Sequence, residues 1–461
     1  MSKCITRIEV NGFYNRFDIA HDFQSGINII HGLNGTGKTT LIHIIANLIN
    51  GDYYRFLYIP FFKIEAWFND GNKVVIKNND FSTLPEYSQP EHSIRICIND
   101  DRRGILINER YADFENEKIL DQEQASAILL KTYTVNKVIL PSAYFPAFRT
   151  MIEAWKTADT NSGEAFLSKS TNLSRKLFGQ FTPSLNYPTP VDIENAINNE
   201  IQEIEKEILN IDKELMSQMY IDTLYIFSID YPITQAKDNN SIIENIESIF
   251  EEILKYPIYI NSLSATKIYY KIKDLLTSNS FNVNSSEFIK SLSFFTEVLK
   301  KIEESLRKKF ADMERYLSSV NDFLENKKLE VSKDMFNTKN TFIQVKFNDN
   351  SIISGLGALS SGERQVATML YAATHMSQEQ VVLIDEPEIS LHIDWQRLLL
   401  KKMSEQLPNP QIIVCTHSPF IAEEYADNLK ELELKVSDKY SWIYQDEQNH
   451  EDNNDDEIFN E

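Results

Sequence analysis

The feature that most constrains the fold is a glycine-rich octapeptide, GLNGTGKT, at residues 32–39. Residues 26–30 before it read as a buried strand, and residues 40–49 after it read as a helix. A glycine-rich turn in this position lets backbone N–H groups approach the phosphates of a nucleotide. Lys38 is expected to neutralise the phosphate charge, and the Thr39 hydroxyl is expected to ligate Mg²⁺. The remaining expected contacts of this loop are Asn34, Gly35, Gly37 and Thr40.

Three further motifs follow more than 300 residues downstream. The segment LSSGE at residues 359–363 stands at the head of a predicted helix. An apolar strand pattern at residues 381–384 delivers Asp385 toward Mg²⁺ and Glu386 toward an attacking water, as phosphoryl transfer to water requires. His417 follows another buried strand pattern at residues 411–414. Each motif alone has an ordinary explanation as a surface turn or strand end, but their order and strand-loop contexts together match one architecture.

These four motifs resemble those of the ATP-binding-cassette (ABC) superfamily. The resemblance implies an α/β fold, with an ABC-type ATPase head of the P-loop NTPase class, a mixed sheet and an antiparallel β subdomain. It also implies ATP and Mg²⁺ as cofactors, Thr39 and Asp385 as metal ligands, and Glu386 and His417 as catalytic residues. In that family the signature motif reaches the γ-phosphate held by another subunit. Here this role falls to Ser360, Ser361, Gly362 and Glu363, and it implies dimeric heads.

Composition limits the class of protein. The chain has 461 residues, 42% hydrophobic and 25% charged, which is ordinary for a soluble protein of two or more structural units. We expect a cytoplasmic protein, because no membrane-spanning run and no signal-peptide core are recognisable. Three cysteines without metal-ligand spacing suggest neither a disulfide framework nor a zinc site. A formal net charge of −22 disfavours broad affinity for DNA or anionic membranes, although a local basic groove remains open.

The predicted organisation is a head divided by a helical insertion. Residues 1–150 form the first half, with strand patterns at 73–77 and 93–98 that suggest an antiparallel sheet. Another strand is predicted at 137–140. The segment from this strand to Arg149 resembles the region near the Q-loop of related ATPases, which implies that Arg149 contacts the metal or a partner subunit. A surface or intersubunit salt bridge is the alternative. Residues 339–445 form the second half. Residues 446–461 carry eight acidic residues and no Lys or Arg, which predicts a disordered tail that solubilises the chain or docks a partner.

The insertion at residues 151–338 contains two heptad-like apolar series, from Ile197 to Leu215 and from Leu292 to Leu324. They predict a short antiparallel coiled-coil arm of about 50 Å at ~1.5 Å per residue. A four-residue step between Leu306 and Phe310 would locally relax supercoiling. In one interpretation, the insertion is a compact helical subdomain without a partner. In the other, it is an arm that provides a surface for other subunits or for a protein partner.

The run EPEISLH at residues 386–392 differs from transporter cassettes and resembles the overcoming-lysogenisation ATPases and the related AAA15 and AAA21 groups. Only about 40 residues follow His417, too few for the Toprim nuclease domain of some members. The chain most resembles AriA-type ATPases of PARIS anti-phage systems, with PtuA-type ATPases of Septu systems as the rival. This implies a sensor and scaffold that holds a nuclease, of Toprim type rather than HNH type, and releases it on sensing a phage protein.

Three alternatives remain open. A DNA-repair or chromosome-maintenance ATPase that clamps DNA is disfavoured by the net charge and the short arm. The energising subunit of a transporter would need a membrane partner, and the inserted arm and the sequence after Glu386 oppose it. A structural scaffold locked by ATP would hydrolyse little, whereas Glu386 and His417 favour turnover.

Overall fold

The computed structural model describes the following residues: 3–78, 93–99, 104–108, 138–140, 142–149, 164–228, 239–258, 260–277, 286–332, 342–375, 381–406 and 411–437. The chain forms two compact units. The first combines Met1–Tyr187 with Thr368–Glu461, and the second is Pro188–Ala367. The first unit thus joins segments from both ends of the chain, as the predicted fold class requires. The predicted acidic tail lies outside the described residues.

A five-stranded parallel sheet forms the centre of the first unit. Its order is β14 (Leu429–Glu431), β3 (Ile27–His31), β13 (Gln411–Thr416), β12 (Val381–Asp385) and β8 (Ser142–Phe145). The three central strands are almost continuously apolar, because a parallel sheet is covered on both faces. Since β3, β13 and β12 run the same way, their carboxyl ends meet at one edge.

One strand of this sheet differs from the sequence prediction. The strand predicted at 137–140 is wrong, because residues 138–140 are not in a strand and the strand is β8 at Ser142–Phe145. The Leu140 N–H donates to the Ile49 carbonyl at 2.8 Å, outside the sheet. Pairing begins where Ser142 meets Val381 of β12. This register depends on a distant strand, which local sequence does not specify.

An antiparallel sheet of seven strands completes the first unit and confirms the expected β subdomain. In sheet order its strands are β15 (Lys435–Val436), β2 (Phe17–Asp22), β1 (Ile5–Phe13), β4 (Lys63–Phe68), β5 (Lys73–Asn78), β6 (Ser93–Ile98) and β7 (Ile105–Asn108). Burial alternates along most of these strands, which places one face on the core. Buried Gln411 of β13 exchanges hydrogen bonds with the backbone of Ile5, so it fastens the two sheets together.

The first unit also contains helices. They are α1 (Lys38–Ile49), α4 (Glu164–Phe178), α10 (Ile393–Gln406) and the later part of α9 (Ser361–His375), with short 3₁₀ turns at Tyr53–Tyr58 and Ala426–Asn428. α1 contacts β8, β12 and β13. Its apolar side chains, including Leu41 and Ile45, are fully buried. That burial holds the first turn of α1 beside the carboxyl ends of the strands.

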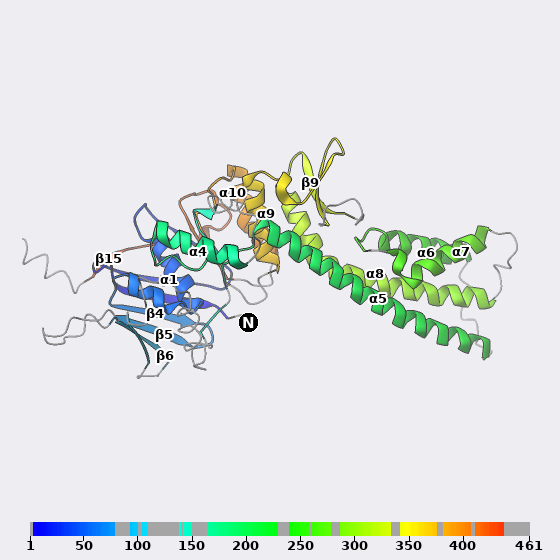
Figure 1. The fold of residues 1–461 in the computed structure, drawn as a ribbon, viewed down its shortest axis with the longest axis horizontal. Coiled ribbons are helices and arrows are strands. Elements are labelled where there is room, and N and C mark those ends of the chain that lie inside the picture. The colour runs from blue at the N-terminus through cyan, green and yellow to red at the C-terminus, as the bar shows by residue number, and fades with distance from the viewer. Residues whose placement is uncertain are drawn as a thin grey trace, which may run out of the picture. The chain divides into compact units, whose positions relative to one another are not determined.

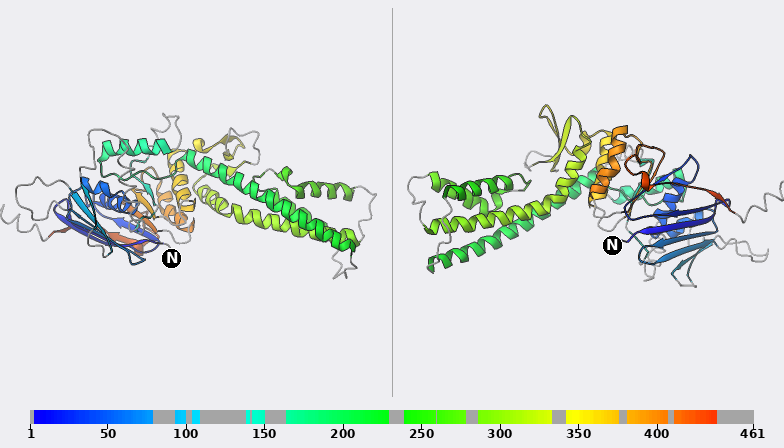
Figure 2. Two further views of the ribbon diagram at one scale, coloured as in Figure 1. Left: turned by 60° about the horizontal axis from the view of Figure 1, so that its bottom comes forward. Right: turned by 180° about the vertical axis from the view of Figure 1, so that it is seen from behind.

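The second unit is a helical arm with a small sheet at one end. Its helices are α5 (Pro190–Ser228), α6 (Asn239–Ile253), α7 (Ser264–Thr277) and α8 (Ser286–Asn321), with 3₁₀ turns at Ile260–Ser262 and Leu356–Ala358. Its strands are β9 (Lys327–Val331), β10 (Ile343–Phe347) and β11 (Ile352–Ser354). Figures 1 and 2 show α5 and α8 running side by side. Lys309 of α8 forms an ion pair with Glu207 of α5.

The bounds of this unit differ from the predicted insertion at 151–338. The start of α5 contacts the small sheet, where Asn198 Oδ1 accepts from the Phe342 N–H at 2.8 Å. Glu194 Oε1 likewise accepts from the Leu356 N–H at 2.6 Å. These long-range contacts place β9, β10 and β11 with the helices, so the unit extends to Ala367. Leu324, the last residue of the second apolar series, lies beyond the end of α8.

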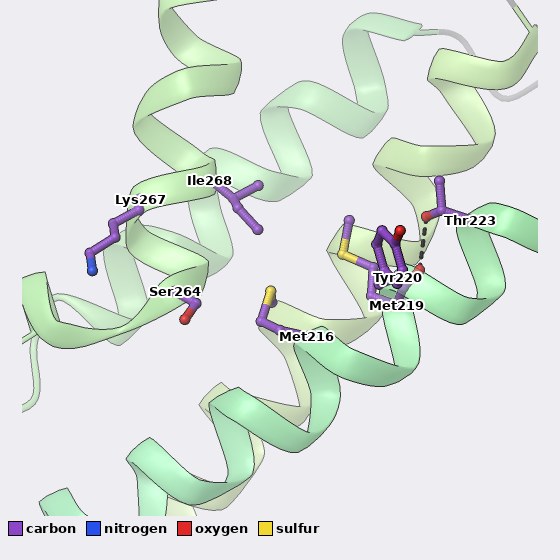
Figure 3. Close-up of a pocket in the computed structure, with 7 residues that line it drawn as sticks. All are labelled: Met216, Met219, Tyr220, Thr223, Ser264, Lys267 and Ile268. Carbon is purple, nitrogen blue, oxygen red and sulfur yellow. Dashed lines mark hydrogen bonds between the residues drawn. The ribbon is translucent and has the colours of Figure 1, made fainter.

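A pocket of about 460 Å³ lies between α5 and α7 of the second unit (Figure 3). Its lining comprises Met216, Met219, Tyr220, Thr223, Ser264, Lys267 and Ile268. These residues offer mainly thioether, aromatic and aliphatic groups rather than acid–base groups. Among the helices that the structure describes, none combines the length and apolar composition needed to cross a membrane.

Candidate functional site

The loop between β3 and α1 has the geometry of an anion site. Gly35 and Gly37 adopt φ angles of 82° and 84°, a left-handed conformation that glycine adopts without a Cβ clash. At Gly37 an added Cβ would also come within 3.0 Å of the Phe13 ring. α1 begins directly after Gly37, which supplies no side-chain cap. The N–H groups of the first helical turn are thus placed to bind a phosphate.

Backbone carbonyls of this loop hold the Lys38 side chain in place. Its Nζ donates hydrogen bonds to the carbonyls of Gly32, at 2.9 Å, and Leu33, at 3.2 Å. It also lies 2.9 Å from His417 Nε2, although 379 residues separate the two in sequence. Burial and the Lys38 charge lower the pKa of His417, which favours a neutral ring that can accept a hydrogen bond from Lys38.

Thr39 and Asp385 meet across the same strand edge, where Thr39 Oγ1 donates to Asp385 Oδ1 at 3.3 Å. Burial raises the pKa of Asp385 to about 6, although the Thr39 hydrogen bond and the charges of Arg149 and Lys38 oppose the shift. A hydroxyl and a carboxylate are the hard oxygen ligands that Mg²⁺ takes together with phosphates and waters. These two residues fit a magnesium ion. The other loop residues lie around them: Asn34 and Gly35 are exposed, and Thr40 is half-buried in α1.

Glu386, the residue after β12, has a φ of 50°, which is unusual for a residue with a side chain. Its Oε1 lies 3.2 Å from His417 Nε2. Burial raises the pKa of Glu386 to about 8, and the neighbouring carboxyl groups of Glu388 and Asp385 add to the shift. A carboxyl group with a raised pKa is a stronger proton acceptor than an ordinary one. The pair can therefore hold or move a proton beside Lys38.

Arg149 is buried in the first unit rather than exposed at its surface. Its guanidinium is 1% exposed and donates to the carbonyls of Pro146, Asp385, Glu386 and Pro387 at distances from 3.0 to 3.1 Å. It is a buried clamp on the backbone after β12. The prediction of a surface position is wrong, because the guanidinium is buried. A contact to the metal or to a partner subunit stays a prediction.

The signature residues lie in the second unit, at the start of α9. The Ser360 N–H donates to Glu363 Oε2 at 2.6 Å, and the Glu363 N–H donates back to Ser360 Oγ at 3.3 Å, which is a capping box. Lys327 Nζ also lies 2.8 Å from Glu363 Oε2. Burial favours the neutral acid, but the Lys327 and Ser360 hydrogen bonds outweigh it and lower the pKa of Glu363. Ser360 and Ser361 are exposed, whereas the Glu363 carboxylate holds the helix start together.

A family profile named AAA_15, described as an AAA ATPase domain, matches residues 4–422. This chain belongs to the AAA ATPase domain family. Membership supports ATPase activity and, with it, the binding of ATP. The prediction of the AAA15-like group is thereby confirmed.

One curated relative of this AAA ATPase is the Retron Vc95 probable ATPase of Vibrio cholerae serotype O1 biovar El Tor. The two are 44% identical over 41 residues, which is 9% of this chain and 8% of the Vibrio protein. The match therefore spans a small part of either chain.

Solved structures align along most of the AAA ATPase chain. An Smc head domain with an extended coiled coil bound to the C-terminal domain of ScpA, from Pyrococcus furiosus, is 14% identical, covers 97% of this chain and 100% of its own, and has a TM-score of 0.39. An Smc head domain with a coiled coil and joint from Pyrococcus yayanosii is 14% identical, covers 94% and 96%, and has a TM-score of 0.37. The recombination mediator RecF is 13% identical, covers 91% and 94%, and has a TM-score of 0.31.

The structure of this AAA ATPase thus brings together five of the predicted site residues within the first unit: Lys38, Thr39, Asp385, Glu386 and His417. Two neighbours of this cluster had no predicted role: Glu388 and Gln396, which hydrogen-bond the loop that carries His417. Glu388 lies inside the EPEISLH run, so its position was visible in the sequence. Its partners follow a different strand and were not.

Proposed function

We propose that the chain binds ATP with Mg²⁺ at the loop of residues 32–39 and hydrolyses it. The observation that carries this proposal is the convergence of three side chains from separate parts of the sheet edge. Lys38 Nζ lies 2.9 Å from His417 Nε2, which lies 3.2 Å from Glu386 Oε1. Phosphoryl transfer to water needs a cationic group at the phosphates and a group that orients the water and accepts its proton.

Each residue of the cluster has one role in this proposal. Lys38 and the backbone N–H groups of Gly35 and Gly37 bind the phosphates, and Thr39 and Asp385 hold Mg²⁺. The ion, when bound, neutralises charge that develops on the phosphate oxygens. Glu386 orients the attacking water and accepts its proton. His417 exchanges its contact with Lys38 for a contact with the terminal phosphate.

The pH dependence of hydrolysis is expected to follow Glu386. A proton acceptor must be ionised, and burial together with Glu388 and Asp385 raises the pKa of Glu386 to about 8. The value of kcat/KM for ATP should therefore rise between about pH 7 and pH 9, because this ratio reports the free enzyme. Phosphate release, measured in matched buffers, should show no such rise in a Glu386→Gln variant. A rise of the same shape in that variant would assign the titration to another group.

The exposed serines of the signature motif are proposed to contact ATP bound by another subunit. Ser361→Arg would place a long cation at this surface, so ATP-dependent dimerisation should be lost while the monomer still binds ATP. We expect at least a tenfold loss of kcat per chain. Mass photometry with ATP would measure assembly, and binding of a fluorescent ATP analogue would measure the monomer site.

The matched control for that experiment is Ser318→Arg, at an exposed position of α8. It adds the same side chain without touching the signature motif, so assembly and turnover should stay near native. Native assembly and activity in Ser361→Arg itself would refute the proposed role in a partner's site.

We further propose that the ATPase is the sensor and scaffold subunit of a bacterial anti-phage system. It would oligomerise through ATP-bound heads, hold a nuclease effector, of Toprim type as in PARIS or HNH type as in Septu, and release it on sensing a phage protein. Two observations support this: the EPEISLH pattern at residues 386–392 and the local match to the probable ATPase of a retron. AriA-type ATPases of PARIS systems are the finer resemblance that we favour.

Co-expression with the product of the neighbouring gene tests this role. Affinity purification in the presence of ATP, followed by mass analysis, should recover a stable complex with a nuclease. A Toprim partner would support the PARIS reading, and an HNH partner the Septu reading. Recovery of the ATPase alone, with hydrolysis stimulated by duplex DNA, would replace the proposal with a DNA-clamping function.

A further inference from the structure

One oxygen of Glu388 accepts three hydrogen bonds from the loop that carries His417. Glu388 Oε1 lies 2.7 Å from Thr416 Oγ1, 2.8 Å from the His417 nitrogen and 2.9 Å from the Ser418 nitrogen. The three donors come from consecutive residues: Thr416, which ends β13, and the two residues after it. Hydrogen bonds to an ionised carboxylate are shorter and stronger than those between neutral groups. Such a convergence on one atom fixes the backbone of the loop.

The fold explains how Glu388 reaches these donors. β12 and β13 are parallel neighbours, and Asp385 stands opposite Cys415 in their register. The Glu386 N–H donates to the Cys415 carbonyl at 2.8 Å, so the two backbone segments stay paired one residue beyond β12. The backbone then turns, with the Leu391 N–H donating to the Glu388 carbonyl at 3.0 Å. This turn points the Glu388 side chain across to the next strand end.

A second contact fixes the far side of the same loop. Ser418 Oγ donates to Gln396 Oε1 at 2.6 Å, and Gln396 Nε2 donates to the Leu391 carbonyl at 3.0 Å. Gln396 and Leu391 belong to the segment that follows Glu388. The loop after β13 is therefore hydrogen-bonded to the segment after β12 by two side chains, Glu388 and Gln396.

We propose that Glu388 is a positioning residue, which holds the backbone of Thr416, His417 and Ser418 so that the His417 ring meets Lys38 and Glu386. This inference rests on the role proposed for His417 in hydrolysis. Glu388 would not touch ATP. Its positioning effect would pass through the imidazole, whose Nε2 lies within 3.2 Å of both Lys38 Nζ and Glu386 Oε1. The Glu388 carboxyl also raises the pKa of Glu386, and Glu388→Ala and Glu388→Gln remove that influence alike.

Two substitutions separate the hydrogen bonds from the charge. Glu388→Ala removes the acceptor, and kcat should fall by about 10- to 100-fold, the usual loss when a partner that orients a functional histidine is removed. The KM for ATP should stay within about twofold, because the loop of residues 32–39 is untouched. Glu388→Gln keeps an amide oxygen that accepts the same three donors, so it should restore most of kcat. Glu433→Ala, at an exposed position, is the matched control.

A double-mutant cycle with His417→Ala tests whether Glu388 acts through the imidazole. If it does, the double variant should be no slower than His417→Ala, within about twofold, because the loss can occur once. Losses that multiply would overturn the proposal. Equal losses in Glu388→Ala and Glu388→Gln would also overturn it, since the charge and not the acceptor would then matter.

Hydrogen exchange separates this inference from the proposed function. In Glu388→Ala, the amides of His417 and Ser418 should exchange at least tenfold faster, whatever the rate of hydrolysis. Native turnover in His417→Ala, together with faster exchange in Glu388→Ala, would remove the catalytic role of His417 but keep the role of Glu388 in holding the loop. Unchanged exchange in Glu388→Ala would overturn that holding role. If Glu388→Ala fails to fold, Glu388→Asp, one methylene shorter, replaces it in each measurement.

Discussion

Glu386→Gln is expected to bind ATP with native affinity and to hydrolyse it about 10²- to 10³-fold more slowly, because the amide cannot accept the proton of the attacking water. The substitution conserves volume. The native Oε1 lies 3.2 Å from His417 Nε2, a contact that the amide group can also make. The loss should therefore fall on kcat rather than on KM, since the phosphate loop and the Asp385 site are unchanged.

Single-turnover hydrolysis of radiolabelled ATP, with a filter-binding assay for affinity, separates these two effects. Lys38→Ala serves as the control that should lose ATP binding, because it removes the ammonium group that is hydrogen-bonded to the Gly32 and Leu33 carbonyls of the phosphate-binding loop. A Glu386→Gln protein with the native single-turnover rate would show that the catalytic base is another residue. Loss of ATP binding in that variant would show that Glu386 holds the nucleotide site together.

The parts of the fold that depend on local pattern were predictable from sequence. The octapeptide, the strand before it and the helix after it occur as expected, with β3 at Ile27–His31 and α1 at Lys38–Ile49. Glycines with left-handed φ angles, alternating burial and continuous apolar runs are properties of neighbouring residues. These properties can therefore be recognised in the sequence without the structure.

The parts that depend on distant pairing were not predictable in the same way. The start of β8 is set by Val381 of β12, 239 residues beyond Ser142 in the chain. The end of the second unit is set by contacts of Asn198 and Glu194 with residues more than 140 positions later. The sequence could not show which groups Arg149 contacts, because its acceptors are backbone carbonyls, which residues of any type provide.

Arg149→Ala is expected to destabilise the first unit by roughly 3–5 kcal/mol, because several buried carbonyls lose a charged hydrogen-bond donor. Four backbone carbonyls would lose a donor, and three of them belong to Asp385, Glu386 and Pro387. Glu386 would also lose support for its left-handed φ of 50°. Urea unfolding of the nucleotide-free protein would measure the stability, and steady-state ATP hydrolysis would measure the effect on kcat.

Arg397→Ala is the matched control, because Arg397 is 44% exposed and pairs with Glu423 at the surface, where an ion pair contributes about 0–1 kcal/mol. Arg149→Lys should lie between native and Arg149→Ala, since an ammonium group retains the charge but lacks the planar fork that reaches several carbonyls at once. Equal stability of Arg149→Ala and Arg397→Ala would mean that the backbone after β12 keeps its conformation without the guanidinium. Loss of stability with native kcat would instead separate the fold of this segment from the orientation of Glu386.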